Sequence, residues 1–257
     1  MRRMVGLLTC GLAVSVFVGM EPMRAEADGV ERLTVRILAE YPHDTNAFTQ
    51  GLIWCGDYVY ESTGRYGASR LRQVRLSDGE LIREVRLSPR LFGEGLARRG
   101  EQLVQLTWRS GIAMIYDFAT FRETGRLSYS GEGWGLTFDG GWFIMSDGSD
   151  VLTFRDPDTF AVWRRLPVTL EGRPVHLLNE LEYAHGSVFA NVWQSTDIVR
   201  IDPATGAVTA VIDASSLPHR SRMAGEDVLN GIAYHAERGT FLLTGKLWPK
   251  LFEVRFE

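Results

Sequence analysis

One glutamate, Glu94, stands out in this chain as a group that could move a proton. Gly93 and Gly95 leave its carboxylate beside open backbone. If indole rings surround it, the charged form is poorly solvated and the pKa rises, which suits a group that both accepts and donates a proton. The alternative is a structural glutamate that caps a turn or pairs with one of the 26 arginines. Spacing alone leaves both interpretations open.

A lysine, Lys246, is the second candidate because lysine is rare in this chain. There are 26 Arg and only two Lys, Lys246 and Lys250, and both lie within residues 245–250. Arginine fills nearly every other cationic position, so a retained ammonium indicates a site where a compact cation is wanted. Chance clustering of the two lysines is the alternative.

Three tryptophans, Trp108, Trp134 and Trp193, could form the walls of a pocket around these groups. They occupy corresponding places in three repeats of the chain, which favours an aromatic-walled pocket. The alternative is that they are ordinary core between sheets.

Metal sites have weak support in the sequence. The five histidines lie at positions 43, 176, 185, 219 and 235, none at ligand spacing from another His or Cys. His43, which follows a proline, is expected to hold a turn. Oxygen ligands from Glu94, Asn179 and Asn230 could suit calcium, but no Asp shares their position in the repeats. Serine hydrolysis lacks a nucleophile elbow.

The elements that must position these groups come from a short repeated segment. It reads Gln50-Gly-Leu52, Glu94-Gly-Leu96, Trp134-Gly-Leu136, Asn179-Glu-Leu181 and Asn230-Gly-Ile232, at spacings of 44, 40, 45 and 51 residues. A second set, Ser62, Thr107, Ser146, Asn191 and Thr244, follows 12, 13, 12, 12 and 14 residues later. Spacings of about 40–50 residues are typical of four-stranded propeller blades. The pattern predicts an all-β fold with five blades.

Each repeat continues as short alternating strands separated by Gly or Asp turns, which is typical of a β-meander. The fifth repeat lacks a strand, whereas residues 33–39 form an alternating strand ahead of the first repeat. We therefore expect this N-terminal strand to complete the last blade and remove the open edges of the ring. The first strands should then bring five residues to one rim: Gln50, Glu94, Trp134, Asn179 and Asn230. The ends of the second strands add Trp108, Trp193 and Lys246 in a neighbouring layer.

Residues 1–27 are predicted to be a secretory signal peptide. Arg2 and Arg3 precede an apolar run, and Ala25-Glu-Ala27 is a small-x-small cleavage signal. A retained membrane anchor is the alternative, although the run is shorter than the roughly 20 apolar residues of a spanning helix. A lipid anchor at Cys10 is disfavoured by Thr9 before it. The expected location is periplasmic or secreted, with no membrane attachment after cleavage.

Residues 28–257 are expected to form one propeller domain and a monomer. They keep 25 basic and 30 acidic residues, a net charge near −5 that disfavours nucleic acid as a partner. Only Cys55 remains after cleavage, so no internal disulfide can form, and it is interpreted as a small buried hydrophobe.

The chain resembles the plant and bacterial glutaminyl-peptide cyclotransferases from about Tyr41 to Phe252. The motifs that carry the resemblance are Tyr41-Pro-His-Asp44, Ala47-Phe-Thr-Gln-Gly-Leu52, Tyr60-Glu-Ser-Thr-Gly64, Phe92-Gly-Glu-Gly-Leu96, Gln105-Leu-Thr-Trp108, Glu132-Gly-Trp-Gly-Leu-Thr137, Leu178-Asn-Glu-Leu-Glu-Tyr183, Asn191-Val-Trp193, Asp227-Val-Leu-Asn-Gly-Ile232 and Thr244-Gly-Lys-Leu-Trp-Pro-Lys250.

This resemblance implies a five-bladed propeller and an aminoacyltransferase that converts the N-terminal glutamine of peptides or proteins to pyroglutamate and releases ammonia. It implies that Glu94 is the acid/base residue. The implied substrate-binding residues are Phe48, Gln50, Trp108, Trp134, Asn179, Trp193 and Lys246. No cofactor or catalytic metal is implied, although a structural calcium in the channel is compatible with the family.

Two competing functions remain at this point. One is a calcium-dependent propeller hydrolase of the lactonase type, and the other is a non-catalytic propeller that binds peptides. Activity that survives a chelator argues against the first, and ammonia release from a glutaminyl peptide excludes the second.

Overall fold

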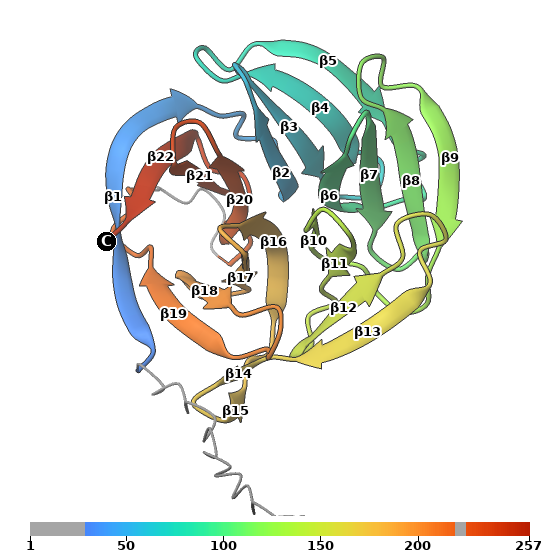
Figure 1. The fold of residues 1–257 in the computed structure, drawn as a ribbon. Helices are drawn as coiled ribbons and strands as arrows, with labels where there is room; N and C mark the ends of the chain where they lie inside the picture. The colour runs from blue at the N-terminus through green and yellow to red at the C-terminus, as the bar shows by residue number, and fades with distance from the viewer. Residues whose placement is uncertain (1–28, 219–224) are drawn as a thin grey trace, which may run out of the picture.

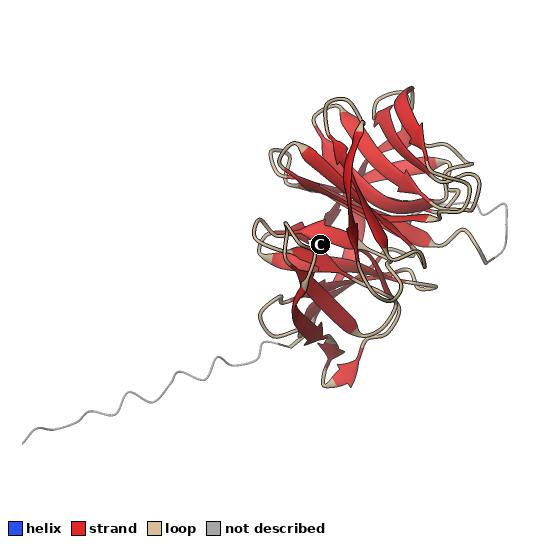
Figure 2. Cartoon of the chain, turned by 90° about the vertical axis from the view of Figure 1, so that its right-hand side faces the viewer, coloured by secondary structure: helices blue, strands red, loops and turns tan. Residues whose placement is uncertain are grey.

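The computed structural model describes residues 29–218 and 225–257, and the regular structure within them is β-strand throughout (Figure 2). The all-β prediction is confirmed. Among the described residues, no helix has the length and apolar character needed to cross a bilayer. The predicted signal peptide, with Cys10, lies outside the described residues.

Three of the sheets are four-stranded antiparallel meanders of consecutive strands. The first contains β2 (Thr49–Cys55), β3 (Tyr58–Thr63), β4 (Arg70–Arg75) and β5 (Leu81–Arg86). The second contains β6 (Gly93–Arg99), β7 (Gln102–Thr107), β8 (Ile112–Asp117) and β9 (Glu123–Ser128). The third contains β10 (Leu136–Phe138), β11 (Phe143–Met145), β12 (Val151–Arg155) and β13 (Val162–Pro167).

An eight-stranded sheet contains both ends of the described chain, in the order β16-β17-β18-β19-β1-β22-β21-β20. Its strands are β1 (Glu31–Pro42), β16 (Leu178–Ala184), β17 (Ser187–Val192), β18 (Asp197–Ile201), β19 (Val208–Asp213), β20 (Leu229–His235), β21 (Thr240–Gly245) and β22 (Lys250–Phe256). A two-stranded ribbon, β14 (Thr169–Leu170) and β15 (Arg173–Pro174), was not predicted from the sequence.

The predicted pairing of the N-terminal strand with the last strand is confirmed. Residues 35–42 of β1 pair antiparallel with β22. The division into sheets differs from the five separate four-stranded blades expected: two of the four-stranded sets are joined in one eight-stranded sheet, because β1 spans 12 residues instead of the seven predicted. Its first residues, 31–34, pair parallel with β19, so hydrogen bonding continues from one four-stranded set into the next.

The sheets are arranged in a ring around a central axis, with β2, β6, β10, β16 and β20 nearest the centre (Figure 1). These five strands contact one another in a closed cycle: β2 with β6, β6 with β10, β10 with β16, β16 with β20, and β20 with β2. Their first residues therefore converge on the same region.

The glycines of the repeated segment allow this close approach. A Cβ at Gly51 would lie 2.5 Å from the backbone nitrogen of Leu96, and one at Gly95 would lie 2.4 Å from that of Leu136. The fourth repeat has Glu180 at this position, and its carboxylate accepts hydrogen bonds from the Leu52 and Ile232 amides at 3.2 and 2.8 Å. At Gly51 and Gly95, the inner strands approach closely because no side chain separates them. At Glu180, a carboxylate bridges two inner strands through hydrogen bonds.

The apolar core lies between neighbouring sheets, as in the cluster that joins the first sheet to the second. Tyr60 and Leu71 of the first sheet pack there with Leu96, Leu103 and Tyr116 of the second. Cys55, predicted to be buried, is only partly so: it packs at the edge of the same cluster with its thiol 3.0 Å from an Arg98 nitrogen.

Deleting residues 33–39 should unfold or aggregate the protein, because β19 and β22 would both be left with an unpaired edge. A chain that starts at Asp28 keeps β1 and should remain folded. Circular dichroism and size-exclusion chromatography would compare the two. A soluble, monomeric and active deletion variant would contradict the role of β1 in closing the ring.

Candidate active site

The first residues of the inner strands meet the last residues of the second strands at one rim. Antiparallel pairing brings this about: Gly93 at the start of β6 pairs with Thr107 at the end of β7, and Leu178 with Val192 in β16 and β17. The next residues along the two strands therefore lie on either side of each pair: Glu94 and Trp108 in the first case, Asn179 and Trp193 in the second.

A pocket opens at this rim, with a cavity of about 260 Å³. That volume is slightly below the roughly 300–1,000 Å³ of sites for drug-sized ligands, and it suits a single amino-acid residue. The lining residues are Phe48, Gln50, Phe92, Glu94, Trp108, Trp134, Asn179, Trp193 and Lys246. Five are aromatic, and four carry polar groups that could orient a ligand.

The structure brings together all eight residues proposed from the sequence and adds one, Phe92. Phe92 belongs to the quoted motif that contains Glu94 and packs against Trp108, with ring centroids 5.5 Å apart. Asn230, expected on the same rim, is not among the lining residues. Its side-chain amide instead donates to the Thr49 carbonyl at 2.9 Å and to Gln50 Oε1 at 3.2 Å.

The second repeated set of small polar residues holds the backbone of the pocket residues. The Ser62 hydroxyl donates to the Glu94 carbonyl of the next sheet, and the Ser146 hydroxyl donates to the Asn179 carbonyl at 2.6 Å. Each of these serines is fully buried. A second strand of one sheet therefore positions the first strand of its neighbour.

Glu94 is the only carboxylate among the lining residues, and it is 4% exposed. Burial raises its pKa well above the usual range; the charge of Lys246 opposes this shift and that of Glu132 adds to it. Gln50 Nε2 donates to Glu94 Oε1 at 3.0 Å. Because Gln50 Oε1 accepts from Asn230, the orientation of the Gln50 amide is set on both sides.

Lys246 follows β21 and is 6% exposed, with its ammonium 4.8 Å from the centre of the Phe48 ring. Burial lowers its pKa to about 8, although the charge of Glu94 favours the protonated form. The pocket thus holds an acid with a raised pKa and a base with a lowered one, a combination typical of functional sites.

Two of the three indole N–H groups are already engaged. Trp108 Nε1 and Trp134 Nε1 both donate to Glu132 Oε2, at 2.7 and 3.1 Å. Trp193 meets Trp134 edge to face, with centroids 5.6 Å apart. Glu132 was not among the site residues predicted from the sequence, although it lies two positions before Trp134 in one of the family motifs.

Among residues 29–218 and 225–257, no group of three or more His, Cys, Asp or Glu side chains could hold a metal ion. Within the pocket, a cation would meet one carboxylate, Glu94, and the ammonium of Lys246.

Comparison with known proteins identifies the family of this chain. The sequence model of the glutamine cyclotransferase family matches residues 11–256. The chain belongs to this family. It is 40% identical over 228 residues to a glutaminyl-peptide cyclotransferase of Arabidopsis thaliana, covering 87% of this chain and 71% of that protein. The crystal structure of Myxococcus xanthus glutaminyl cyclase superposes with a TM-score of 0.83 at 45% identity, covering 89% of this chain and 98% of that one.

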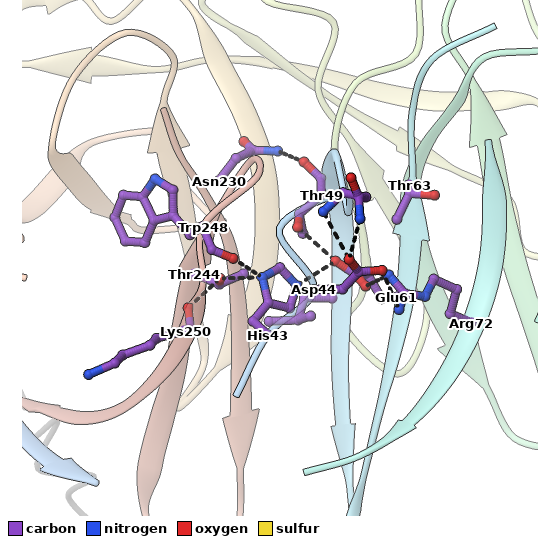
Figure 3. Close-up of polar contacts among 12 residues, drawn as sticks. His43, Asp44, Thr49, Glu61, Thr63, Arg72, Asn230, Thr244, Trp248 and Lys250 are labelled. Atoms are coloured by element: carbon purple, nitrogen blue, oxygen red, sulfur yellow. Dashed lines mark hydrogen bonds and ion pairs between the residues drawn. The ribbon is translucent and has the colours of Figure 1, made fainter. Parts of the chain in front are cut away.

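A buried polar network centres on His43 (Figure 3) and reaches Thr49, the residue before Gln50 of the pocket. His43 Nδ1 lies 2.7 Å from the Trp248 carbonyl, and Nε2 lies 3.0 Å from Glu61 Oε1. Both ring nitrogens face acceptors, an arrangement that favours a protonated imidazole donating from both. Burial alone would lower the pKa of His43, but the charge and hydrogen bond of Glu61 outweigh it and raise the pKa.

The same carboxylate connects His43 to the strand that carries Gln50. Glu61 Oε1 accepts from the Thr49 hydroxyl at 2.7 Å, and Oε2 lies 3.3 Å from an Arg72 nitrogen. Burial opposes ionisation of Glu61, yet His43 and Arg72 together lower its pKa. His43 was predicted to hold a turn, and it does: it fixes the turn after Lys246 against β2 and β3.

Replacing Glu61 with Gln should lower the free energy of unfolding by about 3 kcal/mol, as expected when one partner of a buried ion pair is removed. Urea unfolding would measure it. Glu84→Gln is the control, because Glu84 pairs with Arg70 and Arg86 in a half-exposed setting and should change stability by less than about 1 kcal/mol. Equal losses would contradict the importance of the network.

The same pair predicts a pH dependence of stability. The raised pKa of His43 makes its contribution complete below the ordinary value of 6.5 and lost as pH rises through the folded-state pKa. The lowered pKa of Glu61 makes its contribution present above 4.5 and lost as pH falls through its folded-state pKa. Wild-type stability should therefore fall on the alkaline side of this window, and Glu61→Gln should weaken that fall. An unchanged alkaline slope in the variant would argue against a protonated His43.

Proposed function

We propose that this chain converts the N-terminal glutamine of peptides or proteins to pyroglutamate with release of ammonia, and that Glu94 transfers the protons. The observation that carries the proposal is the buried Glu94 carboxylate with its raised pKa, alone of its kind in an aromatic pocket large enough for one residue. Membership of the glutamine cyclotransferase family and the similarity to a plant glutaminyl-peptide cyclotransferase support the same reaction.

The proposed architecture is a five-bladed β-propeller. The eight-stranded sheet is then counted as two blades, β16–β19 and β20–β22 with β1. The closed cycle of five inner strands supports this count, as does the similar make-up of all five four-stranded sets.

In the proposed mechanism, the neutral α-amine of the substrate attacks its own γ-carboxamide carbon. Ionised Glu94 takes a proton from the amine as the new C–N bond forms, and gives that proton to the amide nitrogen as the old C–N bond breaks. Ammonia leaves and the carboxylate is regenerated. A raised pKa suits both transfers, and the pocket walls supply the folded-back substrate geometry that makes the attack intramolecular.

The developing oxyanion needs a hydrogen-bond donor, and several donors of the pocket already bind other groups. The indole N–H groups of Trp108 and Trp134 donate to Glu132, and the Gln50 amide donates to Glu94. Lys246 is the proposed donor, with Asn179 as a second. A buried ammonium stabilises charge more strongly than a solvated one.

The alternative of a calcium-dependent hydrolase is less well supported, because the Lys246 ammonium would repel a cation beside Glu94. We propose that the reaction requires no cofactor; a structural calcium elsewhere in the channel is compatible with it. Ammonia release from Gln-Ala, with and without chelator, tests both this alternative and a purely peptide-binding role. We further propose a periplasmic or secreted monomer, on the basis of the N-terminal sequence and the single domain.

Glu94→Gln should fold normally and lose cyclisation by about 10²–10⁴-fold, the usual contribution of a general acid–base group. The amide keeps the shape of the side chain but cannot exchange a proton. Circular dichroism would confirm the fold, and ammonia release would report the rate. Retention of more than about a tenth of wild-type turnover would refute the assignment of Glu94.

Lys246→Arg should lower kcat/KM for a glutaminyl dipeptide by about tenfold or more, because a planar guanidinium does not fit the tight aromatic site. Lys250→Arg is the matched control. Lys250 is 44% exposed at its side chain and pairs with Glu40, and it points away from the buried network (Figure 3). Equal effects at the two positions would contradict a specific role for the Lys246 ammonium in the reaction.

A further inference from the structure

One carboxylate, Glu132, contacts two walls of the pocket without lining it. Its Oε2 accepts from Trp108 Nε1 at 2.7 Å and from Trp134 Nε1 at 3.1 Å. Its Oε1 accepts from Arg109 Nε at 2.8 Å. We propose that Glu132 is a positioning residue that sets the orientation of both indole rings toward the substrate, an inference that rests on the proposed function.

The two indoles come from different sheets, so nothing in either sheet alone fixes their relative angle. Trp108 directly follows β7, whereas Trp134 lies just before β10. The backbones are joined nearby, since the Gly133 amide donates to the Trp108 carbonyl at 2.9 Å. Backbone pairing leaves the side-chain torsions free, and a shared acceptor removes that freedom for both rings at once.

The effect extends to the other pocket walls through ring contacts. Trp134 meets Trp193 edge to face at 5.6 Å, and Trp108 packs against Phe92 at 5.5 Å. The Arg109 guanidinium lies 3.8 Å from the Trp108 ring centre while its Nε binds Glu132. Four of the five aromatic walls are therefore connected to this carboxylate directly or through one ring.

The chemistry of Glu132 suits this role. Burial opposes its ionisation, but hydrogen bonds from Trp134, Arg109 and Trp108 outweigh burial and lower its pKa. An ionised carboxylate accepts without donating, so one oxygen can serve two N–H groups. Hydrogen bonds to a charged acceptor are also stronger than neutral ones.

An ordinary surface ion pair with Arg109 is the simpler alternative, and the chain contains a matched control for it. Glu123 accepts from Arg126 Nε, and its side chain is 35% exposed, the same fraction as that of Glu132. Glu123 lies in β9, and within the described residues its carboxylate accepts from the Arg126 guanidinium and from no indole. Glu123→Gln thus measures the effect on activity of removing a partly exposed Glu–Arg ion pair that has no contact with an indole.

The test compares Glu132→Ala, Glu132→Gln and Glu123→Gln by steady-state ammonia release from Gln-Ala. Glu132→Ala should lower kcat/KM by about 10–100-fold, with kcat falling and KM rising, because misplaced walls neither bind nor orient the substrate. Glu132→Gln keeps one acceptor oxygen and should lose less. Glu123→Gln should match the wild type.

A second readout does not depend on activity. The chain has seven tryptophans, and ¹⁵N–¹H spectra resolve indole N–H groups as separate signals. The Trp108 and Trp134 signals should shift most in Glu132→Ala, because these two groups lose their acceptor, and neither should shift in Glu123→Gln. If the wild type released no ammonia, the proposed function would fail, while the indole signals would still decide the contacts of Glu132.

Wild-type kinetics in Glu132→Ala would overturn the inference, as would unchanged indole signals. If Glu132→Ala does not fold, Glu132→Gln provides the test. Unaltered kinetics together with unaltered indole signals in Glu132→Gln would overturn the inference, because they would leave Arg109 as the only significant partner of Glu132. Arg109→Ala separates the two contacts, and it should leave both indole bonds and most of the activity in place.

Discussion

The pairing of β1 with β22 and β19 is the constraint on which the rest of this structure depends. A ring of sheets has no free edge only when its two ends are joined, and here one 12-residue strand bonds to both neighbours. Closure keeps the five inner strands in contact, and that contact brings Glu94, Asn179 and Lys246 into one pocket from three separate sheet segments.

Closure and the pocket are also linked along the chain. β1 ends at Pro42, and the next residue, His43, enters the buried network that holds the turn after Lys246 and the strand that carries Gln50. Burial disfavours the charge on this imidazole, so its raised pKa depends on Glu61 and the Trp248 carbonyl remaining beside it. Loss of closure would therefore also disturb the strand that carries Gln50 and the turn after Lys246.

The pocket buries two ionisable groups of opposite charge, and each partly offsets the cost of burying the other. Glu94 and Lys246 are both removed from water, which raises one pKa and lowers the other. Their mutual attraction limits both shifts, and Gln50 adds a hydrogen bond to Glu94. Opposite pKa shifts of this kind in neighbouring groups are typical of functional sites.

Much of this arrangement was predictable from the sequence. Alternating segments and regular spacing predicted strands, and antiparallel geometry placed residues at strand ends on one rim, so Glu94, Trp108, Asn179, Trp193 and Lys246 could be grouped without coordinates. These predictions rest on local periodicity, which each stretch of chain carries by itself.

Only the tertiary structure decided the rest, because it depends on which groups from distant segments become neighbours. β1 could be assigned to the last strand from its pattern, but its parallel bonds to β19 could not. Asn230 matched the rim by spacing, yet its amide turned to Gln50. Glu132 resembled any surface glutamate until two indoles from different sheets were seen to share its oxygen. Hydrogen-bond partners and desolvation are set by three-dimensional packing, and no one-dimensional spacing determines them.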